Sequence, residues 1–282
     1  MSARCRLLAL DIDGTLLGTD SRVSERTRAA VLAARAQGVR LVLVTGRRYP
    51  TARRIAEGLG PGIPLVLHNG AIVVEEGDIL RSVPLPRAAA LTAIRIGRAH
   101  GADPVVHAGQ RGEGRLLVQD VAPTNPLLAR YLDRSRADVV RVADLEAAVD
   151  EDPMQVMFGG VAREMGVLWP RLCAGLAASA RVERTLYPAL GVGILDVLEP
   201  GAGKAVALAF LQGRWGLSAA ETVAIGDNWN DHEMLARAGR GLVMGNADAA
   251  LRALGLEVLP TNDEDGVAVA IERYVLAKSI RG

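Results

Sequence analysis

Acidic side chains occur at two distant places in the chain, each just after a short apolar run. Asp11 and Asp13 follow residues 6–10, and Asp227 follows residues 222–225. Ligands of an open α/β sheet lie beyond the carboxyl ends of its strands, so these carboxylates are expected to meet. Carboxylates that lie close together repel each other, and a divalent cation removes this conflict. Magnesium prefers oxygen ligands, so we expect Mg²⁺ to bind Asp11 and Asp227.

The two-residue spacing of Asp11 and Asp13 indicates covalent phosphoryl transfer. In a strand-to-loop transition, this spacing brings both carboxylates near one reacting phosphorus atom. One carboxylate can attack as a nucleophile, while the other protonates the leaving alcohol and later removes a proton from water. Gly14 permits a sharp turn of the loop, and Thr15 is expected to fix the loop with a side-chain hydrogen bond.

A cation and a hydroxyl group complete the predicted site. Thr45 follows a second buried run, residues 39–44, and Lys204 stands at the predicted start of a helix. An ammonium group and a hydroxyl donor are both suited to binding phosphoryl oxygens. We therefore expect Thr45 and Lys204 to bind the phosphate group of a small phosphate ester.

The elements that position these residues follow an alternating pattern of strands and helices. The buried runs 6–10 and 39–44 flank a helix, for which Ser24 is the predicted N-cap and Gly38 the C-terminal stop. A strand, a helix and a strand in this order form a βαβ unit, which implies a parallel sheet. The later core elements are predicted as a helix over 51–59, a strand over 65–67, a hairpin of 71–74 and 79–83, a helix over 204–215, strands over 222–225 and 241–244, and helices over 231–238 and 267–278.

The regular alternation of predicted strands and helices is interrupted between residues 84 and 196. Predicted helices and strands there no longer alternate regularly, which is typical of an α+β unit. The helices are expected over 87–100, near 127 and over 164–177, and the strands near 105 and 116, over 155–158, and near 181 and 194. The predicted fold class is therefore α/β, with a doubly wound, Rossmann-like parallel-sheet core of residues 1–83 and 197–282 and an inserted α+β cap of residues 84–196.

These features resemble the haloacid dehalogenase superfamily, and in particular its Cof-type (subfamily IIB) phosphatases, in which a large α/β cap interrupts the core. The resemblance spans almost the whole chain. Its motifs are DIDGTL at 11–16, VTGR at 44–47, NGA at 69–71, Lys204, GDNWND at 226–231, NA at 246–247 and DGV at 265–267. The chain departs from the family at one place, because Ala205 follows the lysine where glycine is usual.

The resemblance implies a role for each residue of the site. Asp11 would be the nucleophile, Asp13 the acid/base that also offers Mg²⁺ its main-chain carbonyl, and Asp227 the remaining protein ligand. Thr45 and Lys204 would bind phosphate. Further phosphate- or substrate-binding residues are expected at Gly46, Arg47, Asn69 and Asn230, with Asp231 supporting them.

The composition excludes several other classes of protein. With 33 basic and 32 acidic side chains and a formal net charge of +1, the chain lacks the excess of positive charge that binds nucleic acid. No apolar run reaches the ~18 residues that a membrane-spanning helix requires. Cys5 and Cys173 lie far apart in the sequence, which fits a reducing compartment. We expect a cytoplasmic monomer or homodimer.

Two other functions use the same residues and stay open at this stage. A phosphomutase would return the phosphoryl group from Asp11 to a sugar instead of to water. A non-enzymatic switch would receive the phosphoryl group from a partner protein and keep it. The length of the chain and an acid/base at Asp13 favour a phosphatase over a switch, and sugar phosphates are expected as substrates by analogy.

Overall fold

The structure is a computed structural model that describes residues 4–109, 114–122, 125–187 and 190–277. The chain divides into two compact units. We call Met1–Leu80 with Lys204–Gly282 the core unit, and Arg81–Gly203 the inserted unit.

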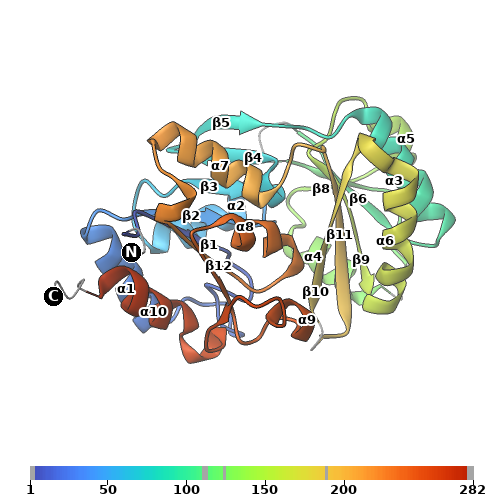
Figure 1. Cartoon of the computed structure of the whole chain (residues 1–282). Coiled ribbons are helices and arrows are strands. Elements are labelled where there is room, and N and C mark those ends of the chain that lie inside the picture. Colours follow the sequence, from blue (N-terminus) through green and yellow to red (C-terminus); the bar gives the residue numbers. More distant parts are fainter. Residues whose placement is uncertain (1–3, 110–113, 123–124, 188–189, 278–282) are drawn as a thin grey trace. The chain divides into compact units, whose positions relative to one another are not determined.

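The core unit contains an eight-stranded sheet in the order β14-β13-β12-β1-β2-β3-β4-β5 (Figure 1). Neighbours from β14 to β3 pair in parallel, and β4 runs antiparallel to β3. The predicted doubly wound core is thus confirmed. The strands are β1 Leu7–Leu10, β2 Arg40–Val44, β3 Leu65–Leu67, β4 Ile72–Glu75, β5 Asp78–Ser82, β12 Thr222–Gly226, β13 Arg240–Val243 and β14 Glu257–Val258.

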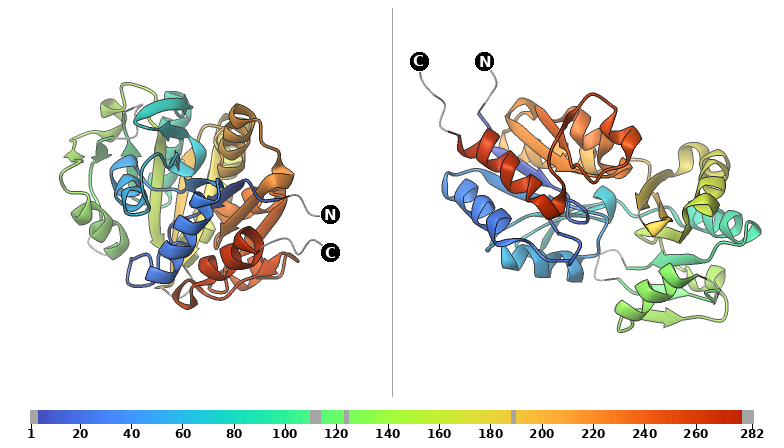
Figure 2. Two further views of the ribbon diagram at one scale, coloured as in Figure 1. Left: turned by 90° about the vertical axis from the view of Figure 1, so that its left-hand side faces the viewer. Right: turned by 90° about the horizontal axis from the view of Figure 1, so that it is seen from below.

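Helices from both ends of the chain pack on this sheet. One sheet face, with Leu7, Val42 and Ala224, forms a core with Leu208 of α7 and Leu235 of α8. Helices α1 and α10 lie side by side although they stand far apart in the sequence (Figures 1 and 2). The helices are α1 Glu25–Ala36, α2 Tyr49–Gly58, α7 Lys204–Trp215, α8 His232–Arg237, α9 Ala249–Arg252 and α10 Gly266–Ile271.

Local chemistry explains where several core elements begin and end. The Ser24 side chain accepts a hydrogen bond from Thr27 N and caps α1, as predicted. Helix α2 begins earlier than the predicted residue 51, because a proline in its first turn is preorganised for a helix. The predicted hairpin is confirmed, and both turn residues, Glu76 and Gly77, have positive φ.

The end of the core unit differs from the single last helix predicted over 267–278. Helix α10 is short and continues as a π-helical segment, Glu272–Leu276, while the predicted final residue, Lys278, lies outside the described residues. Sequence periodicity did not distinguish the two hydrogen-bonding patterns, because their hydrogen bonds differ in span by only one residue.

The inserted unit contains a six-stranded sheet in the order β10-β11-β9-β6-β7-β8. Its pairs are antiparallel except for β7 and β8. Helices α3 and α6 cover one face, where Phe158 is buried, and α4 packs on the other beside Met157. The elements are α3 Arg87–Ala99, β6 Pro104–His107, β7 Leu116–Val118, α4 Pro126–Arg134, β8 Val139–Arg141, α5 Leu145–Ala148, β9 Gln155–Val161, α6 Ala162–Leu176, β10 Arg181–Tyr187 and β11 Val192–Leu198.

Two of these elements, β8 and α5, were missing from the sequence-based prediction because both are very short. None of the helices in the described part of the chain is long and apolar enough to span a membrane.

Candidate active site

The carboxyl ends of β1 and β12 lie next to each other in the core unit. The two strands pair in parallel with Leu10 opposite Ile225, and Asp11 N donates to Ile225 O at 3.0 Å. Asp11 and Asp227 therefore leave the sheet at adjacent positions, 216 residues apart in the chain. The structure thus brings together the carboxylates that the sequence placed at two strand ends.

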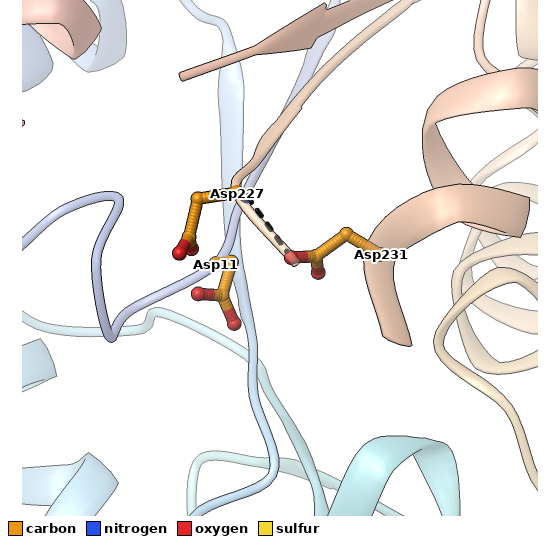
Figure 3. Close-up of side chains that lie close together, drawn as sticks. All are labelled: Asp11, Asp227 and Asp231. Carbon is orange, nitrogen blue, oxygen red and sulfur yellow. Dashed lines mark hydrogen bonds between the residues drawn. The ribbon is translucent and has the colours of Figure 1, made fainter. Parts of the chain in front are cut away.

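Three carboxylates gather at this point. One carboxylate oxygen from each of Asp11, Asp227 and Asp231 lies within 4.8 Å of the other two. Figure 3 shows these three side chains close together. All three residues are buried. Oxygen donors at this spacing fit a hard divalent cation such as Mg²⁺.

The loop after β1 is shaped to fit Asp227. Gly14 has a φ of +78°, and a Cβ atom there would lie 2.3 Å from Asp227 Oδ2. Only glycine combines this backbone conformation with such a close approach. Thr15 Oγ1 donates to Asp227 Oδ1 at 2.9 Å. The hydrogen bond predicted for Thr15 is therefore present, and its acceptor is a site carboxylate.

Lys204 lies between two of the carboxylates. Its Nζ is 2.6 Å from Asp11 Oδ1 and 2.7 Å from Asp231 Oδ1, at the first residue of α7. Both ion pairs are almost fully buried. In this structure the ammonium group neutralises carboxylates, and it lies close enough to Asp11 to contact a group bound there.

Asp231 also fixes the backbone of the neighbouring loop. Its Oδ2 accepts hydrogen bonds from Asp227 N at 3.2 Å, drawn in Figure 3, and from Asn228 N at 3.1 Å. Because Oδ1 accepts from Lys204, both oxygens of Asp231 already have partners. Asp11 and Asp227 are therefore better placed to bind a cation than Asp231 is.

Burial and mutual repulsion raise the pKa values of the site carboxyl groups. Desolvation raises the pKa of Asp227 to about 7, with a further contribution from the charge of Asp231. Desolvation also raises the pKa of Asp11 well above its ordinary range; Lys204 opposes this shift, while Asp231, Asp227 and Asp13 add to it. Burial alone would lower the pKa of Lys204, but Asp11 and Asp231 outweigh it and the pKa is raised. A cation bound among these carboxyl groups would favour their ionised forms and lower their pKa values.

The loop after β2 brings the predicted VTGR motif to the same end of the sheet. Thr45 is buried, and its Oγ1 accepts a hydrogen bond from Arg47 N at 3.1 Å. A Cβ atom on Gly46 would lie 3.1 Å from Asn69 Oδ1, so a larger residue there would require the Asn69 amide to shift slightly. The Arg47 guanidinium binds both carboxylate oxygens of Asp13, with Nε to Oδ2 at 2.7 Å and Nη2 to Oδ1 at 2.6 Å.

The two predicted asparagines contact each other. Asn230 Nδ2 donates to Asn69 Oδ1 at 2.9 Å, which joins the loops that follow β3 and β12. Asn69 has a φ of 51° and is buried, and its backbone N–H donates to Thr45 O. Asn230 therefore orients the Asn69 amide.

Two further asparagines were not singled out in the sequence as site residues. Asn246 Nδ2 donates to Gly14 O at 2.8 Å, and Asn262 Nδ2 donates to Leu17 O at 2.8 Å. Asn262 N in turn donates to Asn246 Oδ1 at 3.0 Å. Together they hold the loop that carries Asp13. For Asn246, the only sequence signal was its place in the NA motif after a predicted strand.

Comparison with known proteins identifies the family. A model of the haloacid dehalogenase-like hydrolases matches residues 8–271. The chain belongs to this family. The resemblance found in the sequence motifs is thereby confirmed, and so is the assignment of the protein as a hydrolase.

Relatives in this haloacid dehalogenase-like family match over nearly their full length. An HMP-PP phosphatase of Serratia proteamaculans is 32% identical over 274 residues, which cover 96% of this chain and 95% of the relative. A 5-amino-6-(5-phospho-D-ribitylamino)uracil phosphatase of Bacillus subtilis is 27% identical over 286 residues, which cover 97% of this chain and 99% of the relative.

Solved structures of the family share the fold. A haloacid dehalogenase-like hydrolase from Bacteroides thetaiotaomicron has a TM-score of 0.78 at 25% identity, covering 96% of this chain and 99% of that chain. A subclass IIB sugar phosphatase of the superfamily has a TM-score of 0.79 at 22% identity, and the match covers 95% of this chain and 98% of that chain. These neighbours support the α/β core with an insert.

Proposed function

We propose that the protein is a magnesium-dependent phosphatase that hydrolyses a small phosphate monoester through a phosphorylated Asp11. The observation that carries this proposal is the position of Asp11, a buried carboxylate at a strand end that contacts Lys204 and lies beside Asp227. The names of the two relatives described above, both phosphatases of small molecules, support the substrate class.

In the proposed reaction, Asp11 acts first. A carboxylate oxygen of Asp11 bonds to phosphorus while the bond from phosphorus to the ester oxygen breaks, and Asp13 gives its proton to the leaving oxygen. Water then attacks the phosphorus of phospho-Asp11 and loses a proton to Asp13. Inorganic phosphate leaves, and the Asp11 carboxylate is restored.

Asp11 and Asp227 would hold Mg²⁺ with their carboxylates, and Asp13 with its main-chain carbonyl. The cation, when bound, stabilises the negative charge of the transferring phosphoryl group. Thr45 and Lys204 would bind the other phosphoryl oxygens. Lys204 is suited to this because the carboxylates of Asp11 and Asp231 raise its pKa and so favour its charged form.

Residues 84–196 would form the cap that selects the substrate. The protein would act in the cytoplasm. The assignment to the cytoplasm is supported by two free cysteines, Cys5 and Cys173, and the enzyme would act as a monomer or homodimer. Sugar phosphates are the proposed substrate class, because one fold neighbour is a sugar phosphatase.

The test is phosphate release from p-nitrophenyl phosphate with Mg²⁺, with EDTA, and with the Asp11→Asn variant. We expect release only from the unchanged protein with Mg²⁺, together with an acid-stable, base-labile phosphoenzyme. A panel of phosphorylated metabolites would then identify the substrate. Equal phosphate release by Asp11→Asn would contradict the proposal, and an isomerised sugar phosphate without free phosphate would indicate a phosphomutase.

A further inference from the structure

The ion pair between Arg47 and Asp13 joins the loops after β1 and β2. The planar guanidinium donates to both oxygens of the carboxylate, at 2.7 Å and 2.6 Å. The sequence predicts Arg47 as a phosphate- or substrate-binding residue, and in the structure its guanidinium binds the side chain proposed for proton transfer. A bidentate pair fixes the plane and direction of a carboxylate as well as its position.

Both partners are held by their backbones. Arg47 N donates to Thr45 Oγ1 at 3.1 Å, and Arg47 O accepts from His68 N at 3.2 Å. On the other side, Asp13 forms an isolated β-bridge with Leu17. The backbone of Arg47 is therefore held in place while its guanidinium binds Asp13. The loops after β1 and β2 together set the direction of the Asp13 carboxyl group.

A contribution to folding stability does not explain well why Arg47 and Asp13 form this ion pair. The side chains of Arg47 and Asp13 are 28% and 40% exposed, and solvent screens an ion pair of this kind so that it adds little to folding stability. Orientation, in contrast, has large effects on rate, since a displacement of ~1 Å in a reacting group can cost about 10²-fold.

We propose that Arg47 is a positioning residue that directs the Asp13 carboxyl group toward the oxygen of the leaving group. This inference rests on the proposed phosphatase function and assigns Arg47 a part in it. When Asp13 carries its proton, one oxygen still accepts from the Arg47 fork, and the O–H on the other is directed at the leaving oxygen. After transfer of that proton, both oxygens accept from Arg47, as in this structure.

The inference is tested with two aryl phosphates and the Arg47→Lys variant. p-Nitrophenolate leaves readily without a proton, whereas phenolate depends on the acid. Lysine keeps the positive charge for binding phosphate but cannot hold both carboxylate oxygens in one plane. We expect Arg47→Lys to raise the ratio of kcat/KM for p-nitrophenyl phosphate to that for phenyl phosphate about tenfold, with the larger loss on phenyl phosphate.

A double-mutant cycle with Asp13→Asn shows whether Arg47 acts through Asp13. If it does, Asp13→Asn alone raises the ratio, and adding Arg47→Lys changes it by less than about twofold. Equal losses on both substrates, or losses that multiply in the double variant, would overturn the inference in favour of direct phosphate binding. An unchanged ratio in Arg47→Lys would also overturn it.

Controls separate this inference from folding and from the proposed function. Arg53→Met removes an exposed arginine and its ion pair with Glu57 on α2, and should leave the ratio unchanged. Thermal unfolding of each variant reports on folding, and Arg47→Met provides a second variant that lacks the fork. An unchanged protein that releases no phosphate with Mg²⁺ contradicts the phosphatase proposal itself, whereas an active protein with an unaltered ratio contradicts only the role of Arg47.

Discussion

Lys204 Nζ lies 2.6 Å from Asp11 Oδ1, and the ion pair that they form is almost fully buried. The same ammonium group is 2.7 Å from Asp231 Oδ1. One lysine thus joins the start of α7 to the end of β1 and to the segment that follows β12. The charge that would bind phosphate also compensates the repulsion between the carboxylates while no substrate is present.

Replacing Lys204 with methionine should therefore destabilise the fold as well as abolish activity. Methionine fills a similar volume but leaves Asp11 and Asp231 buried without their partner. Breaking a buried pair in this way typically costs about 3–5 kcal/mol of unfolding free energy, which urea unfolding would measure. Arg6→Met, which removes the surface pair with Glu221, is the control and should unfold at nearly the same urea concentration. A Lys204→Met variant as stable as that control would contradict the prediction.

Gly14→Ala should remove activity by crowding Asp227. The new Cβ would lie 2.3 Å from Asp227 Oδ2, at a backbone φ of +78°. Gly77→Ala is a matched control, because Gly77 has a φ of +92° and nothing within 4 Å of a new Cβ. Both variants should lose about 1 kcal/mol through backbone strain. Only Gly14→Ala should also lose phosphatase activity and magnesium affinity, and equal activity in the two variants would show that the close approach does not matter.

The sequence predicted which strand ends carry the site, because buried apolar runs followed by polar residues are a local pattern. Asp11, Thr45 and Asp227 lie where that pattern placed them. The partners of the side chains were not predictable, since they depend on which atoms face each other across loops. Arg47 was predicted to bind phosphate or substrate, and nothing in the sequence indicated that its guanidinium binds Asp13.

In the inserted unit, the pairing of the strands could likewise not be predicted from the sequence. Its long helices and strands were predicted near their observed positions, but the sheet order β10-β11-β9-β6-β7-β8 was not. Pairing there joins strands that are far apart in sequence, such as β6 and β9, and is set by packing rather than by a local signal. Likewise, the positive φ values of His68 and Asn69 were not predicted, although histidine and asparagine adopt positive φ more often than most residues do.

The raised pKa of Asp227 predicts an unusual pH dependence of stability in the absence of metal. In the folded protein Asp227 keeps this proton until the pH approaches its pKa of about 7, because burial and the charge of Asp231 oppose ionisation. The unfolded chain releases it near the ordinary value of ~3.9. Between these values the folded state binds more protons, so the unfolding free energy should fall as pH rises from 5 to 8.

Urea unfolding in EDTA at pH 5 and pH 8 would measure this fall. Mg²⁺ should stabilise the protein more at pH 8 than at pH 5, because the cation competes with the proton for the carboxylates. Asp227→Asn removes one titrating group and should reduce the dependence, while Asp11, whose pKa is also raised, still contributes to it. Metal-free protein that becomes more stable between pH 5 and pH 8 would contradict the prediction.

Asn246 offers a test of how the loop after β1 is held. Its amide N–H donates to Gly14 O, and its amide oxygen accepts from Asn262 N. Asn246→Asp keeps the acceptor and the shape of the side chain but loses the donor to Gly14. Because the residue is exposed and a single hydrogen bond contributes about 0.5–1.5 kcal/mol, stability should change little. The value of kcat/KM for p-nitrophenyl phosphate should nevertheless fall about tenfold or more, since Asp13 and Asp227 both depend on the position of this loop. Asn246→Ala removes both hydrogen bonds and should lose at least as much activity, so wild-type turnover in either variant would show that the loop holds its position without Asn246.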